Sequence, residues 1–209
     1  MKTVGYAAKS QGSELTEFEF ERRDLRNNDV EIEILYCGVC HSDLHAVRND
    51  WGGVKYPLVP GHEIVGKVKS VGSDVKKYKQ GDTVGVGCMV DSCKSCDQCD
   101  NNEEQFCREG MVGTYAGKDR ETGEMTQGGY SKHVVVREEF VLSIPQNLDL
   151  SRVAPLLCAG ITKDFLKKLR YLETTRRFYM FDKYFDYKKN KTTYKTEVLA
   201  GTTTFLTMA

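Results

Sequence analysis

The chain has 209 residues, with 30 Lys and Arg against 30 Asp and Glu, so its formal net charge is zero. This balance gives no overall electrostatic reason to bind nucleic acid or an anionic membrane. No apolar stretch approaches the roughly 20 residues that a transmembrane helix needs, and Met1 to Ala7 contain no apolar secretory core. We therefore expect a soluble, cytoplasmic protein.

Residues 1–161 have the pattern of a β-rich domain. Short segments alternate apolar and polar side chains with period two, which is typical of half-buried strands. Glycines between them suit bulges and tight corners. The fold predicted is mainly β with short helices, rolled into an antiparallel barrel or sandwich. The expected strands are residues 14–20, 30–35, 64–68, 83–86 and 133–136.

Two short helices are expected, one between the strands and one after the last of them. Residues 42–48 form the first, with Ser42 or Asp43 as the capping residue. Near residue 152 a second helix begins, capped by Asp149 or Ser151, and it tolerates Pro155 only in its first turn.

Four cysteines follow one another with the spacing C-x2-C-x2-C-x7-C, at Cys93, Cys96, Cys99 and Cys107. Zinc prefers four tetrahedral thiolates, and cysteines two residues apart can bend round one ion. Disulfides are the first alternative, but they need an oxidising compartment. A redox pair is the second, but it needs a single C-x-x-C beside a βαβ unit. The spacing favours a structural zinc lobe.

The four residues Cys93, Cys96, Cys99 and Cys107 are called the cysteine ladder below. Further potential zinc ligands lie outside it. Catalytic zinc keeps one position open and is commonly held by three protein ligands, for example two cysteines and one histidine. Cys40, His62 and Cys158 supply such a set. We interpret the remaining two cysteines, Cys37 and Cys88, as small buried apolar side chains.

Several motifs in residues 1–161 resemble a known family. Gly61, His62 and Glu63, followed by Gly66, Gly72 and Val75, reproduce the signature G-H-E-x2-G-x5-G-x2-V of zinc-containing medium-chain alcohol dehydrogenases. The segments at 40–45 (CHSDLH), 49–52 (NDWG), 126–130 (TQGGY) and 154–160 (APLLCAG) resemble its cinnamyl-alcohol dehydrogenase branch. The resemblance implies a GroES-like catalytic domain at 1–161 that carries a structural zinc lobe.

The resemblance also implies roles for individual residues. Cys40, His62 and Cys158 match the catalytic zinc ligands, and Glu63 matches a carboxylate that takes the fourth position when substrate is absent. Asp43 matches the carboxylate that orients His62, in line with the general need to fix a metal-bound imidazole. Cys93, Cys96, Cys99 and Cys107 match the structural zinc ligands.

Four further matches surround that centre. Ser42 matches the hydroxyl that takes the proton of the alcohol, and His45 matches the next relay station. His41 matches a position that often faces the cofactor pyrophosphate, and Trp51 lines the substrate pocket. Structural alternatives stay open: a helix cap for Ser42, a surface polar role for His41, core packing for Trp51, and a local ion pair or hydrogen bond for Glu63.

The activity implied is hydride transfer between a primary alcohol or aldehyde and NADP(H), with two zinc ions per chain. Partners are then small-molecule alcohols or aldehydes, with neither nucleic acid nor membrane, and the oligomeric state stays open. A non-catalytic zinc-binding remnant or interaction module is the alternative function. The third hypothesis is a zinc-ribbon nucleic-acid binder, because the C-terminal segment is basic and rich in Tyr and Phe.

Composition changes at about residue 161. All four prolines and all eight cysteines precede Ile161, whereas residues 162–209 hold eleven Lys and Arg against five Asp and Glu. This segment shows no G-x-G-x-x-G fingerprint and no strand–helix alternation, so no Rossmann domain is expected. We interpret 162–209 as a non-homologous, weakly structured tail read out of frame, and expect the truncated chain to be inactive without a cofactor domain.

Resequencing the gene tests this interpretation. A shifted frame that resumes a Rossmann coding sequence downstream of codon 161 is the expected result. An intact single frame with no such coding sequence would contradict it.

Overall fold

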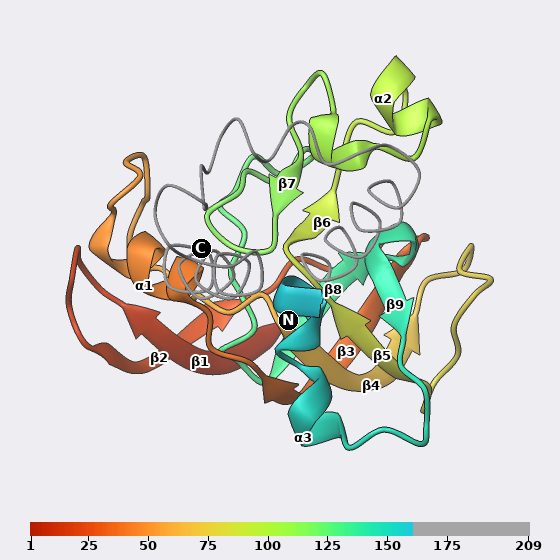
Figure 1. The fold of residues 1–209 in the computed structure, drawn as a ribbon, viewed down its shortest axis with the longest axis horizontal. Helices are drawn as coiled ribbons and strands as arrows, with labels where there is room; N and C mark the ends of the chain where they lie inside the picture. The colour runs from red at the N-terminus through yellow and green to blue at the C-terminus, as the bar shows by residue number, and fades with distance from the viewer. Residues whose placement is uncertain (161–209) are drawn as a thin grey trace, which may run out of the picture. The chain divides into compact units, whose positions relative to one another are not determined.

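Antiparallel strands make up most of the regular structure in the computed structural model, which describes residues 1–160 (Figure 1). Met1–Cys158 form one unit. Within the described residues, no helix has the length and apolar character needed to cross a membrane. The elements in chain order are β1 Lys2–Ala8, β2 Leu15–Glu21, β3 Asp29–Cys37, α1 His41–Arg48, β4 Ile64–Val71, β5 Thr83–Val86, β6 Met89–Asp91, α2 Asp97–Asp100, η1 Glu104–Phe106, β7 Val112–Gly113, β8 His133–Arg137, η2 Glu138–Phe140, β9 Val141–Ser143 and α3 Leu150–Val153.

The strands form one large sheet and two small ribbons. The large sheet has the order β8-β3-β4-β5-β9, and the ribbons are β1-β2 and β6-β7. In Figure 1, α1 lies beside the β1-β2 ribbon and α2 lies beyond the β6-β7 ribbon. A hydrogen bond from Gly12 N to Val47 O, 2.8 Å long, joins the β1-β2 turn to the end of α1.

The main core lies on one face of the large sheet. Cross-strand pairing places apolar side chains opposite one another, as in Val30 with Val136 and Ile32 with Val134. Because side chains alternate between the two faces of a strand, this register sends the whole apolar set inward. The buried members are Val30, Ile32, Ile64, Val68, Val84, Val86, Val134, Val136 and Val141.

A smaller core holds the segment that carries Cys158. Leu157 and Val153 pack with Val65 of β4 and with Ile144, and all four are buried. Gly85 of β5 allows this approach, because a Cβ there would lie 2.9 Å from Leu157 Cδ1. The packing fixes the position of residue 158 against the large sheet.

The predicted fold class, mainly β with short helices, is confirmed, and all five predicted strands are present. Strands β1, β6, β7 and β9 were not predicted. In β1 the inward positions include Thr3, Gly5 and Ala7, so no apolar alternation marks the strand. The other three have only two or three residues, too few for a periodic signal.

Both predicted helices form, with one correction to the capping. Helix α1 begins at His41 after Cys40, so neither Ser42 nor Asp43 is the N-cap. Asp43 instead stabilises the first turn from inside the helix, since its Oδ2 accepts a 2.8 Å hydrogen bond from Cys40 N. Asp149 does cap α3, and Pro155 follows the end of that helix rather than lying in its first turn.

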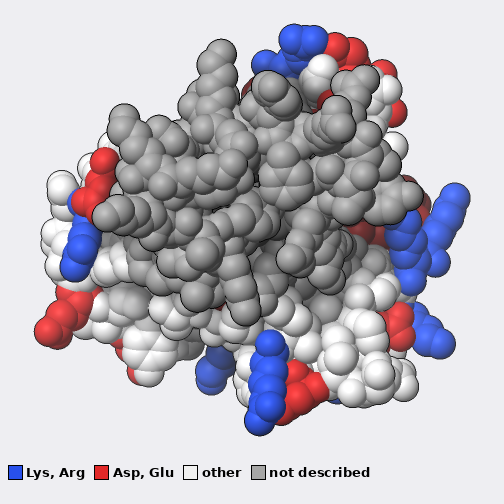
Figure 2. Space-filling view, in the orientation of Figure 1, with Lys and Arg blue, Asp and Glu red and all other residues white. Residues whose placement is uncertain are grey.

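The interpretation of residues 162–209 as a weakly structured tail lies outside the described residues. On the described surface, Figure 2 shows Lys and Arg interspersed with Asp and Glu on the face in view. This distribution agrees with the even charge balance of the chain.

The signature glycine of β4, Gly66, should be required for packing. A Cβ at Gly66 would lie 2.2 Å from Glu33 O of the neighbouring strand, so we expect Gly66→Ala to lower the free energy of unfolding by about 3 kcal/mol. Gly12→Ala is the control, because Gly12 has φ +71° but open space around it, and we expect a cost of about 1 kcal/mol. Urea unfolding of the zinc-loaded chain measures both, and equal costs would contradict the packing argument.

Candidate functional site: two metal-binding clusters

Three separate segments bring four potential metal ligands together. Cys40 precedes α1, His62 and Glu63 precede β4, and Cys158 lies in the helical residues 156–160. One ligand atom from each of these four residues lies within 4.8 Å of all the others. His62 and Glu63 are buried, while the two cysteines are half-buried with their sulfurs 4.0 Å apart.

Glycines permit this crowding. Gly61, before His62, has φ +99°, which favours glycine, and a Cβ there would lie 2.6 Å from the Tyr130 ring. A Cβ at Gly38 would lie 2.1 Å from Glu63 Oε2. The glycines of the G-V-C and G-H-E segments therefore leave room for the Glu63 carboxylate and for the Tyr130 ring.

Asp43 hydrogen-bonds the segment that carries His62. Its Oδ1 accepts a hydrogen bond of 2.9 Å from Gly61 N and lies 3.2 Å from His62 Nδ1. Burial would raise the pKa of Asp43, but the hydrogen bond and charge of His62, together with the backbone N–H groups of Cys40 and Gly61, outweigh burial and lower it. The carboxylate therefore stays ionised and fixes His62 through Nδ1, which leaves Nε2 for a metal.

The protonation of His62 depends on the same partners. Burial opposes its charged form, but hydrogen bonds and charges from Asp43 and Cys158 prevail and raise the pKa of His62 to about 10. A metal binds neutral imidazole, so binding here must displace a proton. Metal affinity at this cluster should rise with pH.

Glu63 provides the test of whether a cation suits the cluster. Its Oε2 is buried, and among the described residues it has no hydrogen-bond partner. Burial, the largest cause, raises the pKa of Glu63, and the negative charge of Asp43 adds to the effect. A buried carboxylate oxygen without a partner is costly, so a cation between Glu63, His62 and the two thiolates fits these residues.

The predicted relay residues lie along α1. Ser42 Oγ is 3.5 Å from Cys40 Sγ. His45 Nδ1 is 2.7 Å from Asp50 Oδ2, whereas its buried Nε2 lacks a partner among the described residues.

Two aromatic rings lie beside His45. The centroid of its ring is 5.2 Å from that of the His41 ring and 5.1 Å from that of the Trp51 ring. Trp51 is 63% exposed, so the alternative that it is a core residue is wrong.

The two remaining cysteines differ from one another. Cys37 packs partly buried against the main core, and burial raises the pKa of its thiol to about 12. Its interpretation as an apolar side chain is consistent with this environment. Cys88 is exposed, so its expected burial is wrong. Its thiol instead faces Cys158, whose hydrogen bond lowers the pKa of Cys88.

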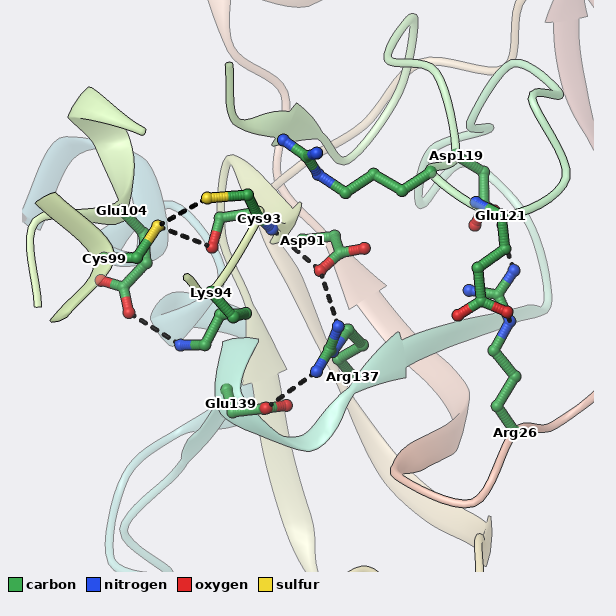
Figure 3. A network of polar contacts seen from close by, with 12 residues as sticks. Arg26, Asp91, Cys93, Lys94, Cys99, Glu104, Asp119, Glu121, Arg137 and Glu139 are labelled. Atoms are coloured by element: carbon green, nitrogen blue, oxygen red, sulfur yellow. Dashed lines mark hydrogen bonds and ion pairs between the residues drawn. The ribbon is translucent and has the colours of Figure 1, made fainter. Parts of the chain in front are cut away.

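The second cluster is the cysteine ladder. All four sulfurs lie within 4.8 Å of one another, and none of the eight cysteines of the chain is in a disulfide. Figure 3 shows two of the four, Cys93 and Cys99. The Cys93–Cys99 and Cys96–Cys99 sulfur distances are 3.8 and 3.6 Å. Tetrahedral zinc with Zn–S bonds of about 2.3 Å requires sulfurs about 3.8 Å apart. The spacing of these sulfurs therefore fits one zinc ion.

Backbone groups favour thiolates in this lobe. The N–H groups of Arg108 and Cys93 point at the sulfurs of Cys96 and Cys107, each over 3.4 Å. A hydrogen bond from the Ser95 backbone is the largest cause that lowers the pKa of Cys93, to about 6. Thiolates are the form that binds zinc.

Ion pairs connect the lobe to its surroundings. Lys94, inside the first C-x-x-C loop, lies 2.9 Å from Glu104 and adopts φ +58°. Arg137 at the end of β8 bonds Asp91 and Glu139, which flank the lobe in Figure 3.

Sequence reasoning missed two aromatic residues at the first cluster. Tyr130 donates a 3.0 Å hydrogen bond to Asp43 Oδ2. The Tyr115 ring lies 5.6 Å from the His62 ring. The TQGGY motif did mark Tyr130, although it gave no role, whereas nothing in the local sequence marks Tyr115.

Comparisons with known proteins agree with the fold. The profile of the alcohol dehydrogenase GroES-like domain matches residues 26–146. A probable mannitol dehydrogenase 1 from Stylosanthes humilis is 55% identical over 161 residues, 77% of this chain and 45% of that protein. A probable cinnamyl alcohol dehydrogenase 8B from Oryza sativa subsp. japonica is 53% identical over 159 residues, 76% of this chain and 36% of that protein.

Solved structures give the same result. The cinnamyl alcohol dehydrogenase of Helicobacter pylori, crystallised with NADP(H), has a TM-score of 0.78 and 45% identity over 81% of this chain and 49% of its own. An enzyme of the same name from Sorghum bicolor has a TM-score of 0.79 and 43% identity over 83% and 49%. The chain thus spans less than half the length of these relatives, and it belongs to the zinc-type alcohol dehydrogenase family, in which its residues 26–146 form the GroES-like domain.

Proposed function

We propose that residues 1–161 form the metal-binding, substrate-side domain of a zinc-dependent alcohol dehydrogenase that acts on a primary alcohol or aldehyde with NADP(H). The observation that carries the proposal is the Cys40–His62–Glu63–Cys158 cluster, in which one buried carboxylate oxygen of Glu63 has no hydrogen-bond partner among the described residues. The names of the relatives support the substrate class, and the NADP(H) complex of one neighbour supports the cofactor.

Cys40, His62 and Cys158 would hold the catalytic zinc, with Glu63 in the fourth position when no substrate is bound. When bound, zinc supplies Lewis-acid polarisation of the alcohol or aldehyde oxygen and NADP(H) supplies the hydride acceptor or donor. Cys93, Cys96, Cys99 and Cys107 would hold the second, structural zinc. These thiolates need a reducing compartment, so the proposal places the protein in the cytoplasm.

The residues of α1 would move the proton. Ser42 takes it from the alcohol oxygen and passes it to His45. The buried Nε2 of His45, which has no partner in the part of the chain described, supports this role, as does the contact that fixes Nδ1 on Asp50. His41, beside His45, would face the cofactor, and the exposed Trp51 would meet substrate.

The proposal includes a domain boundary near residue 161. The similarity to the relatives extends over 159–162 residues, and the composition of the chain changes at about residue 161. No G-x-G-x-x-G fingerprint occurs in the 209 residues, so we expect this chain by itself to bind zinc without turnover. As such it would be the non-catalytic zinc module of the alternative hypothesis.

Zinc content should separate the two centres. We expect two zinc ions per wild-type chain and one in Cys99→Ser or Cys40→Ser, because each change removes a thiolate from a different cluster. Elemental analysis by mass spectrometry measures the ratio. Cys37→Ser is the matched control, since Cys37 belongs to neither cluster, and it should keep two ions. A wild-type chain with one zinc ion would rule out the proposed pair of sites.

Activity should appear when a cofactor domain is supplied. Residues 1–160, fused to the cofactor-binding part of the Helicobacter pylori enzyme, should reduce cinnamaldehyde with NADPH, while the 209-residue chain alone should not.

In the fusion, Asp43→Asn should lower kcat/KM by roughly 10- to 100-fold, because His62 loses the hydrogen bond that orients it. Asp74→Asn, on an exposed turn, is the control. A fusion that holds two zinc ions yet does not reduce cinnamaldehyde would contradict the proposed reaction.

A further inference from the structure

The segment 127–131, which overlaps the TQGGY motif at 126–130, lies directly against the G-H-E segment. Its backbone N–H groups donate from Gly128 to Val59 O and from Gly129 to Gly61 O, over 2.6 and 2.7 Å. The Gln127 side chain accepts a 2.7 Å hydrogen bond from Val59 N. The two segments therefore form one rigid unit immediately before His62.

Both glycines of the motif are needed for this approach. A Cβ at Gly128 would lie 2.4 Å from Pro60 O, and a Cβ at Gly129 would lie 2.3 Å from Ile64 Cγ1. Contacts this short do not occur with real Cβ atoms, so the motif holds glycine for steric reasons.

Arg22 fixes the other side of the same segment. Its guanidinium donates to Gly128 O over 2.7 Å, to Ser131 Oγ over 2.8 Å and to His133 O over 3.0 Å, and it also bonds Gln127 O. A planar guanidinium with several fixed acceptors has little freedom to move. Tyr130, between these anchored residues, is thus held in one place.

Tyr130 reaches the metal cluster through Asp43. Its hydroxyl donates to Asp43 Oδ2 over 3.0 Å, the oxygen that also accepts from Cys40 N. The other oxygen, Oδ1, faces His62 Nδ1. The two donors on Oδ2, together with Tyr115, which also hydrogen-bonds Asp43, therefore set the rotation of the carboxylate and, with it, the direction of the hydrogen bond to His62.

We propose that Tyr130 is a positioning residue of the Cys40–His62–Cys158 metal centre and acts on His62 only through Asp43. The inference rests on the proposed function, because it takes that cluster to be a zinc site. Without the hydroxyl, the buried carboxylate loses one of its donors and rotates more freely, so His62 is less well oriented for metal.

The test is zinc affinity of the full chain, measured by competition with a chromophoric chelator. We expect Tyr130→Phe to weaken the Cys40–His62–Cys158 site about tenfold, the lower end for partners beyond the ligands, and to leave the cysteine ladder unchanged. The matched control is Tyr78→Phe, which also removes a partly buried hydroxyl, one that donates to Val141 O over 2.6 Å. It should change neither site.

A double-mutant cycle distinguishes this role from general destabilisation. If Tyr130 acts through Asp43, Tyr130→Phe should have no further effect on affinity in an Asp43→Asn background. Additive effects, equal weakening of both sites, or an unchanged affinity in Tyr130→Phe would each overturn the inference while leaving the proposed function intact. A wild-type chain without zinc at Cys40 and His62 would instead overturn the proposed function and the inference together.

Discussion

The buried carboxylate of Asp43 joins the parts of the chain that make the first metal cluster. It is 4% exposed and accepts hydrogen bonds from the start of α1, from the segment before β4 and from Tyr130. A buried charge is stable only when it is fully hydrogen-bonded. These segments can therefore not separate without leaving Asp43 unpaired, and that constraint fixes His62 relative to Cys40.

The two clusters depend on the fold to different degrees. The ladder takes its four thiolates from residues 93–107, within one loop, so metal binding there needs mainly local chain closure. The other cluster joins Cys40 to Cys158, which are 118 residues apart, and needs the large sheet to bring them together. Its position is set by Val65 and Leu157, which pack in the smaller core. Substitutions that destabilise the large sheet should thus weaken metal binding at the first cluster more than at the ladder.

The sequence was sufficient for the features that depend on local spacing. The ladder and the strands with apolar alternation such as β3 were predictable, because spacing or periodicity marks them, and the roles of Cys40 and His62 were implied by the family motifs around them. Features set by tertiary contacts were not. The inward face of β1 holds small and polar side chains, and Cys88 is placed beside Cys158 by the large sheet. Tyr130 meets Asp43 across 87 residues, a distance over which sequence patterns carry no information.

Zinc K-edge X-ray absorption on the purified chain tests the central claim, that it holds two metal centres of different composition. One centre with four sulfurs and one with two predict an average of about three sulfurs per zinc, with a contribution from one imidazole per pair of ions. An average of four sulfurs with no imidazole signal would show that only the ladder binds zinc, and would contradict the account of Cys40, His62 and Cys158.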